Sequence, residues 1–547
     1  MSVAPSSALK GCANVLVDGS ARLGPLSYLI PKDLLVQPGD AVHVPFGKRE
    51  AYGVVLGAGD ASKATREILG IFKRRIHPAD IETAREMARR HLCQLETLVP
   101  RFAPRTAKGA EAVPAGPVQL TTGAEEFETS GKDSLRRLAW CSPSVDRVRF
   151  AAVEAARLAS TGQVLVLCPT KELVTKVLAQ FQSGAARLDA SAERGAWAGF
   201  VEGVVPVGVG TRAAAWFSPK ELAGIVVLDA EHPGHIEAAQ PHTHARDVAI
   251  ERSRAHDVPL TMVSTVCDPA ALQKGVKVLH VGGRLASTCV IDRGVTPNGQ
   301  KLVPTAVQLD VRAALAHGTV CIVAPSRCRL ACANCRTSVV CPDGHHPTEC
   351  TCDLGKCSRC GGSGHVPSGW DAVRLATAFA SYPNSKNLSC VAPEQLHTVK
   401  GAVLTVVLDA DAPLKAASLQ PELAQLRLLM EASATLATDG SLLAVTQDGQ
   451  QPLLRKWAAN DRTGVARVLW NAAKAAVLPP FGRLVLVRVA RATAPAVSSW
   501  PGRVHGPRQL LPGEWEILVR CSDDELPQLA KPLERLRRSA KVRITVS

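Results

Sequence analysis

The chain has 547 residues, 46% of them hydrophobic, so it can bury sizeable cores and is too long for one ordinary domain. Its 64 Lys and Arg residues outnumber 49 Asp and Glu, and the formal net charge of +15 suits a polyanionic partner. The longest apolar runs, such as "GQVLVLCP", are far shorter than the roughly 20 residues of a membrane helix, which excludes an integral membrane protein.

The first residues, "MSVAPSSALKGCANVLVDGS", contain no basic segment followed by an apolar core. No signal peptide is therefore expected, and we predict a cytoplasmic protein. In that reducing compartment the 17 cysteines are not expected to form a disulfide framework. A local cluster of cysteines is instead typical of a metal site.

Short strands dominate the first 75 residues, where "NVLVDG", "LSYLIP", "GDAVHVPFG" and "YGVVLG" are separated by Pro and Gly at turn spacing. We predict a small β-barrel-like domain over 1–75. Apolar residues then recur at helical spacing, and 76–105 is expected to be winged-helix-like. Residues 106–133 mix Gly, Pro, Ser and Thr without periodicity, which is typical of a linker.

Strands and helices alternate from residue 134 onward. "GQVLVLCPTKELVTKVLAQF" predicts a buried strand, a turn and a helix, and "GIVVLDAEH" predicts a buried strand that ends in acids. Together they indicate a parallel α/β sheet over 134–282. A second α/β lobe is expected over 283–470, and a small α+β domain over 471–547. The predicted fold class is therefore multidomain α/β.

Seven cysteines and two histidines lie in "LACANCRTSVVCPDGHHPTECTCDLGKCSRCGG", residues 330–362. Two cysteine pairs, Cys332/Cys335 and Cys357/Cys360, have the two-residue spacing that places both sulfurs on one tetrahedral zinc ion. One zinc site with four cysteine ligands is therefore predicted. No general base accompanies it, so the zinc is expected to be structural and to hold a ribbon for binding.

Further metal donors lie between the two pairs, namely Cys341, Cys350 and Cys352 with His345 and His346. They suffice for a second zinc completed by either His345 or His346, which would give two ions per chain. Their spacing is irregular, because "PDG" follows Cys341 and one residue separates Cys350 from Cys352. The alternative is that these cysteines are leftover thiols of a degraded site.

Basic residues gather in four short runs, "FKRRIH", "ARRH", "RFAPR" and "ERLRRSAKVR". Each run is explained equally well by a solvated face of a helix or strand and by contacts with phosphates. Aromatic residues make up only 4% of the chain, which argues against extended base-stacking platforms.

Eight collinear stretches are specific as a set: "GDAVHVPFGKREAYGVV", "VGVGTRAAAW", "GIVVLDAEH", "HTHARDVAIERSR", "RLACANCRTSVVC", "VVLDADAPL", "LPPFGRLV" and "HGPRQLLPGEWEILVR". Together they resemble the primosomal protein N′ family, the PriA replication restart proteins. The resemblance covers nearly the whole chain. It implies an N-terminal domain that captures a 3′ DNA end, a winged helix, two RecA-like helicase lobes and a C-terminal DNA-binding domain. It also implies a zinc ribbon inserted in the second lobe, at about 328–368.

The parts that bind and hydrolyse ATP in that family are damaged here. Where the phosphate-binding loop should precede a helix, the chain has "CSPSVDR", with no Gly and no Lys to hold phosphate. Pro143 removes an amide donor, and Asp146 would repel phosphate. The segment from Leu428 to Val445, where an arginine finger is expected, has no arginine.

The acidic motif is altered as well. The family has Asp-Glu-x-His, and this chain has Asp229-Ala230-Glu231-His232, so the acid that positions Mg²⁺ is kept and the acid that activates water is lost. No catalytic residue is assigned, and ATP and Mg²⁺ are not expected to support turnover; nucleotide binding without hydrolysis stays open. The degenerate nucleotide site consists of Asp229, Glu231 and His232. The residues expected to be scaffold with buried hydrogen bonds are Asp229, Glu231, His244, Arg246 and Asp247.

The 3′-end pocket of the family carries over only in part. An aromatic and an aspartate precede its tyrosine, and this chain has Leu26-Ser27-Tyr28 there. Loss of the aspartate removes a hydrogen-bond acceptor, so selectivity for a 3′ terminus is in doubt. Lys48 and Arg49 can still supply general phosphate affinity. The predicted DNA-binding residues are Tyr28, Gly47, Lys48, Arg49 and Arg66.

The favoured hypothesis is a monomeric replication restart protein that binds branched, forked and single-stranded DNA without helicase activity of its own. By resemblance its partners are primosome proteins, single-stranded-DNA-binding protein and the replicative helicase, which it helps to reload. The alternative is an active ATP-dependent 3′-5′ DNA helicase with a non-standard nucleotide site. A third hypothesis is a zinc-ribbon protein without DNA function, whose lobes are interaction surfaces.

Overall fold

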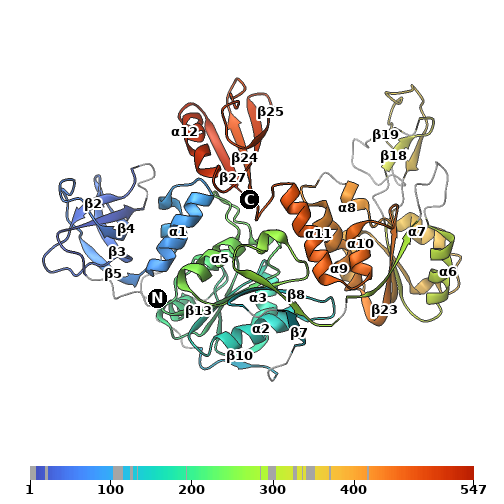
Figure 1. Cartoon of the computed structure of the whole chain (residues 1–547), viewed down its shortest axis with the longest axis horizontal. Coiled ribbons are helices and arrows are strands. Elements are labelled where there is room, and N and C mark those ends of the chain that lie inside the picture. The colour runs from blue at the N-terminus through green and yellow to red at the C-terminus, as the bar shows by residue number, and fades with distance from the viewer. Residues whose placement is uncertain are drawn as a thin grey trace. The chain divides into compact units, whose positions relative to one another are not determined.

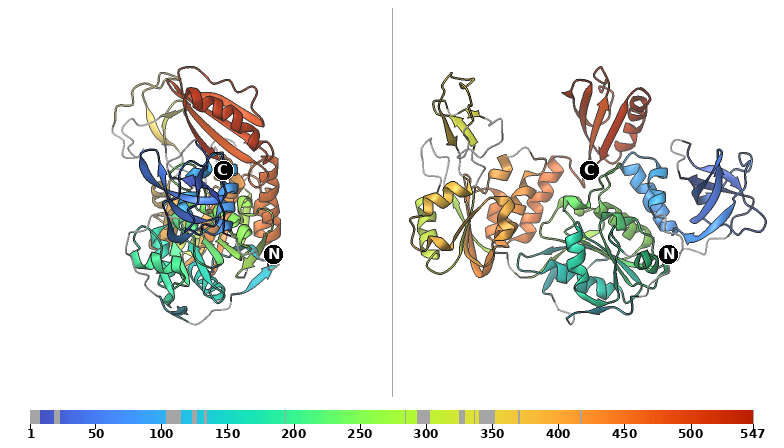
Figure 2. Two further views of the ribbon diagram at one scale, coloured as in Figure 1. Left: turned by 90° about the vertical axis from the view of Figure 1, so that its left-hand side faces the viewer. Right: turned by 180° about the vertical axis from the view of Figure 1, so that it is seen from behind.

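The chain forms two compact units in a computed structural model (Figures 1 and 2). The first unit comprises Met1–Trp140, Asp146–Val281 and Ala473–Ser547, and the second comprises Cys141–Val145 and Gly282–Ala472. Both units mix helices and strands, as predicted. The structure describes residues 8–18, 23–102, 115–122, 127–131, 134–192, 194–283, 285–292, 303–324, 329–335, 337–339, 352–368, 371–415 and 418–546.

The N-terminal part of the first unit is a five-stranded antiparallel sheet in the order β2-β1-β4-β3-β5. Its strands are β1 (Cys12–Val17), β2 (Leu26–Leu29), β3 (Asp40–Phe46), β4 (Arg49–Ala58) and β5 (Gly70–Arg75). Strands β1 to β4 confirm the four predicted strands. Strand β5 overlaps the basic run "FKRRIH", whose charges obscure the apolar pattern of a strand. Alternating valines, including Val15, Val42 and Val44, fill the core of this domain.

One helix, α1 (Pro78–Arg90), follows the sheet, and two 3-10 turns follow the helix, η1 (Leu95–Thr97) and η2 (Val99–Phe102). Pro78 suits the first turn because no N–H is needed there, and the His77 ring accepts the Ala79 N–H. The helix buries Ile81 and Met87. In the described part of 76–105 no strand could form a wing, so this segment differs from the predicted winged helix.

An eight-stranded sheet forms the α/β part of the first unit, in the order β11-β12-β9-β13-β14-β8-β15-β7. Its strands are β7 (Thr129–Gly131), β8 (Arg136–Cys141), β9 (Gln163–Leu167), β11 (Ala185–Arg187), β12 (Val207–Gly210), β13 (Leu222–Leu228), β14 (Leu260–Ser264) and β15 (Val276–Val281). The run from β11 to β8 is parallel, as predicted from the buried apolar strands.

The helices α2 (Arg147–Leu158), α3 (Lys171–Leu178), α4 (Arg194–Glu202) and α5 (Ala245–His256) pack on this sheet. Its 3-10 turns are η3 (Arg212–Trp216), η4 (Pro233–His235) and η5 (Pro269–Ala271). Two short strands, β6 (Gln119–Leu120) and β10 (Phe181–Ser183), form a separate pair. Strands β6 and β7 lie inside the predicted linker 106–133, so part of that segment belongs to this lobe.

The C-terminal part of the first unit is a four-stranded antiparallel sheet in the order β25-β26-β24-β27. Its elements are β24 (Arg483–Ala490), β25 (Arg503–Leu511), β26 (Glu514–Cys521), η8 (Leu526–Leu529), α12 (Ala530–Ser539) and β27 (Lys541–Val546). Helix α12 lies along one face of the sheet, where Leu533 joins its apolar core (Figure 2). Strand β25 has no clear apolar pattern, because most of its residues are exposed.

The second unit contains a five-stranded parallel sheet in the order β16-β23-β22-β17-β21. Its strands are β16 (Ser287–Asp292), β17 (Val320–Val323), β21 (Leu388–Val391), β22 (Ala402–Val407) and β23 (Leu436–Thr446). Its helices and 3-10 turns are α6 (Thr305–Ala314), α7 (Ala372–Phe379), α8 (Ala412–Lys415), α9 (Pro421–Ser433), α10 (Pro452–Ala458), α11 (Arg462–Ala475), η6 (Ser385–Asn387) and η7 (Pro393–Thr398).

A small three-stranded antiparallel ribbon interrupts the second unit, in the order β19-β18-β20. Its strands are β18 (Arg329–Cys332), β19 (Ser338–Val339) and β20 (His365–Ser368). Every helix among the described residues is too short or too polar to span a membrane.

Candidate nucleic-acid interface and metal centre

Four cysteine thiols converge at the base of the ribbon. Cys332 ends β18 and Cys335 lies in the turn that follows, while Cys357 and Cys360 lie in a second turn before β20. Their Sγ atoms all lie within 4.8 Å of one another, and the Cys332–Cys360 and Cys335–Cys357 pairs are 3.4 and 3.6 Å apart. A tetrahedral zinc ion with sulfurs at about 2.3 Å would hold them roughly 3.8 Å apart. The predicted cysteine set can therefore hold one zinc ion.

The backbone and one hydroxyl group favour the thiolate of Cys335. The Cys335 Sγ lies 3.2 Å from the hydroxyl of Thr337, and hydrogen bonding with that hydroxyl and with the Thr337 backbone lowers the pKa of Cys335 to about 6. A lower pKa favours the thiolate, which is the form that binds zinc. The Cys332 N–H donates to the Thr337 carbonyl at 2.9 Å, which closes the first turn.

The second predicted zinc stays a prediction. Cys352 is half-buried and does not belong to the group of four. Its proposed companions Cys341, His345, His346 and Cys350 lie outside the described residues.

Most of the residues predicted to bind DNA gather at one turn of the N-terminal domain. Gly47, with a φ of +62°, links β3 to β4 and is exposed together with Lys48 and Arg49. The Arg66 Nη1 donates to the Gly47 carbonyl at 2.8 Å, and the Arg49 guanidinium lies 5.6 Å from the centre of the Phe46 ring. The turn therefore offers adjacent basic groups on an ordered backbone.

Tyr28 occupies a different position from the one expected of a DNA contact. Its side chain is only 4% exposed, and its hydroxyl donates to the Pro45 carbonyl at 3.0 Å. Burial raises its pKa. The alternation of β2 directs this ring into the apolar core, so Tyr28 supports β3 from within.

The residues predicted to form a degenerate nucleotide site contact other side chains of the protein. Arg147 begins α2, and its Nε lies 2.8 Å from Oδ1 of Asp229, which follows β13. Asp146 caps the same helix, because its Oδ1 accepts the N–H groups of Val148 and Arg149 at 3.0 and 3.1 Å. A helix N-terminus and a free acid are what a bound phosphate and Mg²⁺ require, and here both are occupied by side chains of the protein.

The neighbouring motif residues also make internal hydrogen bonds. Glu231 accepts from the Ser264 hydroxyl at 2.6 Å, and the His232 ring accepts the Gly234 N–H at 2.9 Å. The His244 ring accepts the Arg246 N–H at the start of α5. The scaffold role of these residues stays a prediction, and these contacts support it.

Comparison with known families gives a match to the N-terminal part of the chain. Residues 14–104 match the family model described as the 3′DNA-binding domain (3′BD) of PriA. This range contains the Gly47 turn and Arg66. The N-terminal part of the chain is thus similar to a DNA-binding domain. A comparison with curated proteins finds no significant match.

Several solved structures match the chain at low similarity. The DUF1998 helicase MrfA bound to DNA is 8% identical with a TM-score of 0.32, over 63% of this chain and 52% of that one. S. cerevisiae Dbp5 bound to RNA and ADP BeF3 is 10% identical with a TM-score of 0.29, over 62% and 89%. Mycobacterium smegmatis helicase Lhr bound to ssDNA and AMP-PNP is 13% identical with a TM-score of 0.29, over 60% and 46%. The chain thus spans about half the length of MrfA and Lhr.

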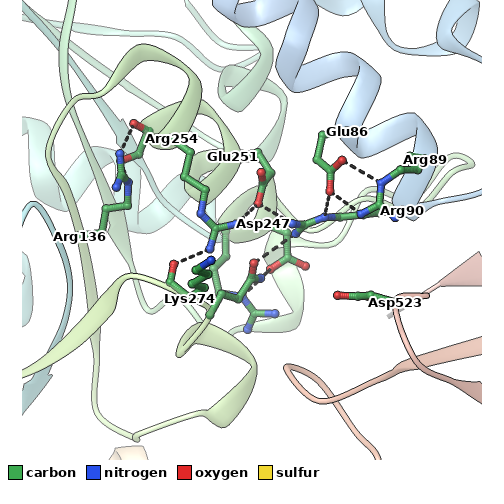
Figure 3. Close-up of polar contacts among 12 residues, drawn as sticks. Glu86, Arg89, Arg90, Arg136, Asp247, Glu251, Arg254, Lys274 and Asp523 are labelled. Carbon is green, nitrogen blue, oxygen red and sulfur yellow. Dashed lines mark hydrogen bonds and ion pairs between the residues drawn. The ribbon is translucent and has the colours of Figure 1, made fainter. Parts of the chain in front are cut away.

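A chain of ion pairs between α1 and α5 was not predicted from the sequence (Figure 3). The Arg90 Nη2 lies 2.8 Å from Glu251, which also pairs with Arg254. Glu86 accepts from Arg89 and Arg90, and although burial opposes ionisation, these bonds hold its pKa at about 2. The spacing of Glu86 and Arg90 favours a pair within one helix, but no local signal indicates the partner helix.

A second contact without a sequence signal is the buried carboxylate of Asp80 on α1. Its Oδ1 lies 3.0 Å from the Arg252 Nε and 2.8 Å from the His256 Nε2, and the Ser218 hydroxyl donates to Oδ2 at 2.5 Å. The side chains of Asp80 and Arg252 are both 0% exposed. Although burial opposes ionisation, the Arg252 guanidinium holds the pKa of Asp80 below its usual value. These contacts fix α1 against α5.

A groove of about 970 Å³ lies between α1 and α12 of the first unit. Its apolar lining includes Leu92, Leu95 and Leu533. Its basic lining consists of Arg85, Arg89, Arg537 and Arg538, opposed by Glu534. The basic runs "ARRH" and "ERLRRSAKVR", which lie far apart in the sequence, therefore contribute to one concave surface.

Proposed function

We propose that this chain binds branched, forked and single-stranded DNA and acts in replication restart without hydrolysing ATP. The observation that carries the proposal is the match of residues 14–104 to the PriA 3′DNA-binding domain. The exposed Lys48 and Arg49, on a turn held by Arg66, provide charges for phosphate oxygens. The net charge of +15 adds a long-range electrostatic attraction to the negatively charged DNA.

The proposed domains follow the sequence divisions with two changes: 76–105 is a connecting segment instead of a winged helix, and β6 and β7 of the linker 106–133 join the first lobe. The other divisions are a 3′-end-binding-like domain over 1–75, lobes over 134–282 and 283–470, and a DNA-binding-like domain over 471–547. Two observations support RecA-like lobes. Each lobe has a run of parallel strands, and in the first lobe β14 lies between β8 and β13, the strands that precede the two nucleotide motifs.

The lack of ATP hydrolysis is proposed from the occupied nucleotide site. The Arg147 guanidinium pairs with Asp229, Ala230 stands where a water-activating acid is needed, and Asp146 caps the helix that would hold phosphate. The chain would thus serve as a platform. The zinc ribbon and the lobes would recruit primosome proteins, single-stranded-DNA-binding protein and the replicative helicase, with the protein acting as a monomer.

The test is a fluorescence anisotropy titration of labelled forked DNA across a series of salt concentrations. We expect binding that weakens linearly with the logarithm of salt concentration, and the slope should fall by about one in Lys48→Ala. Lys63→Ala is the matched control, because Lys63 is exposed in the same domain and lies outside the Gly47 turn. Affinity that ignores salt would contradict DNA binding.

A second measurement distinguishes a DNA-binding protein that does not hydrolyse ATP from an active ATP-dependent helicase. Phosphate release from ATP is followed with forked DNA present and absent. We expect background rates in both cases. A robust DNA-stimulated rate would support the active helicase instead.

A further inference from the structure

The outer face of the N-terminal sheet carries an aromatic ring that the fold leaves uncovered. Phe72, in the edge strand β5, is 44% exposed, and it is the only aromatic residue among the exposed large apolar side chains of the described residues. Burying a phenylalanine ring stabilises a fold. The partly exposed Phe72 ring therefore lacks some of the stabilisation that burial gives to the other described aromatic rings. Leu69 and Ile71 beside it are 51% and 37% exposed.

Two further rings lie next to Phe72. Its ring centre is 5.5 Å from that of Tyr52 on β4 and 6.0 Å from that of His43 on β3, with interplanar angles of 47° and 59°. His43 and Tyr52 are direct partners in the ladder between β3 and β4. The His43 Nε2 also lies 3.0 Å from the Glu50 carboxylate, which holds the imidazole in place. Three neighbouring strands thus present His43, Tyr52 and Phe72 together, and we call this group the aromatic platform.

We propose that the aromatic platform stacks an unpaired base of single-stranded DNA. Aromatic side chains on the open face of a sheet bind bases in this way, and such stacking tolerates any sequence because every base has a π-face. Phe72 is followed in the sequence by Lys73, Arg74 and Arg75, a density of positive charge that suits a phosphate backbone better than an apolar protein surface.

The platform also lies within reach of the Gly47 turn. Arg66, which donates to Gly47, precedes Phe72 by six residues, so the two positions are at most about 20 Å apart along the chain. A strand held at the Gly47 turn can therefore extend to the platform. The inference rests on the proposed DNA binding and adds to it a contact specific for unpaired nucleotides.

The test compares Phe72→Ala, Phe72→Trp and Phe72→Leu with the wild-type chain. Anisotropy titrations use a labelled fork with an unpaired arm and a blunt duplex, each over a salt series. We expect Phe72→Ala to bind the unpaired arm roughly 5- to 150-fold more weakly and the blunt duplex equally well. The salt slope should not change, because a neutral ring releases no counterions. Phe72→Trp should restore affinity and Phe72→Leu should not, since stacking requires a π-face.

Leu35→Ala is the matched control, because Leu35 is 79% exposed in the same domain and lies outside the platform. Equal affinity of the wild type and Phe72→Ala for the unpaired arm would overturn the stacking contact and leave the proposed function standing. Equal losses for arm and duplex, or full restoration by leucine, would also overturn it and would favour a protein-docking or structural role. Failure of the wild type to bind any DNA would remove the proposed function itself.

Discussion

The guanidinium of Arg147 lies against the carboxylate of Asp229, with Nε 2.8 Å from Oδ1 and Nη2 3.4 Å from Oδ2. Asp229 is the acid expected to position Mg²⁺, and it follows the strand β13 in a left-handed conformation with a φ of +49°. The pair is partly exposed, 33% at Arg147 and 12% at Asp229. A permanent side-chain cation thus neutralises the acid that a transient metal ion would need.

Arg147→Ala should free Asp229 without creating an ATPase, because the lysine and the water-activating acid are still absent. We expect background phosphate release from both proteins. We expect the variant to lose about 1 kcal/mol or less of unfolding free energy, and added Mg²⁺ to recover part of that loss. Thermal unfolding with and without Mg²⁺ measures this effect.

Arg187→Ala is the control for Arg147→Ala, since it removes a comparable ion pair with Asp189 at 3.3 Å. Mg²⁺ should not stabilise this control. A DNA-stimulated ATPase in the wild type that Arg147→Ala abolishes would show that Arg147 belongs to a working catalytic site.

The sequence predicts what depends on local spacing. Cys332 and Cys335 are separated by one turn, so their shared ligand role follows from the sequence alone. Arg147 and Asp229 are 82 residues apart, and only the parallel sheet brings the end of β8 and the end of β13 together. Even though Arg147 lies in the segment identified as a damaged phosphate-binding loop, its partner is fixed by tertiary structure.

Charge patterns mislead prediction in a different way. The run "FKRRIH" is as typical of a solvated face as of a phosphate-binding one. Its charges therefore give no sequence signal for strand β5 or for the exposed Phe72. Conversely, the family resemblance indicates Tyr28 as a surface contact, although the period-two alternation of β2 directs it into the core. Exposure of single side chains on short strands depends on which face the rest of the domain covers.

Cys335→Ala should remove one zinc ion per chain. Its thiol is one of four converging sulfurs, and loss of one ligand leaves an incomplete tetrahedral site. Metal analysis of the purified protein by mass spectrometry measures the change. Cys289→Ala is the control, because Cys289 is an exposed thiol of the same unit outside the group of four. Unchanged zinc content in Cys335→Ala would contradict the site.

Asp80→Asn should destabilise the first unit strongly. It would leave the Arg252 guanidinium buried without its counter-charge, and breaking a buried ion pair costs about 3–5 kcal/mol. Urea unfolding, combined with hydrogen exchange in α1 and α5, would locate the loss. Asp60→Asn removes an exposed carboxylate of the same chain and should leave the urea midpoint nearly unchanged. A loss below about 1 kcal/mol in Asp80→Asn would contradict the anchoring role.

Acid should destabilise the first unit through two buried histidines, His91 and His235, and the half-buried His244. Burial lowers the pKa of His91 and His235 to about 4 and that of His244 well below its usual value. The folded chain keeps these rings neutral, whereas the unfolded chain binds protons near pH 6.5. The unfolding free energy should therefore fall as the pH drops from about 6.5 to 4, by roughly 2 kcal/mol at pH 5 for each of His91 and His235.

His235→Gln isolates one of these contributions. The His235 ring is 0% exposed and its Nε2 lies 2.8 Å from the Leu228 carbonyl, so the variant should be less stable at neutral pH. Its loss of stability between about pH 7.5 and about pH 5 should nevertheless be smaller than that of the wild type by roughly 2 kcal/mol, because one proton-linked group is gone. Urea midpoints at the two pH values give this difference. His397→Gln, at an exposed position, should keep the full pH dependence, and an equal pH dependence in His235→Gln would show that His235 is not the linked group.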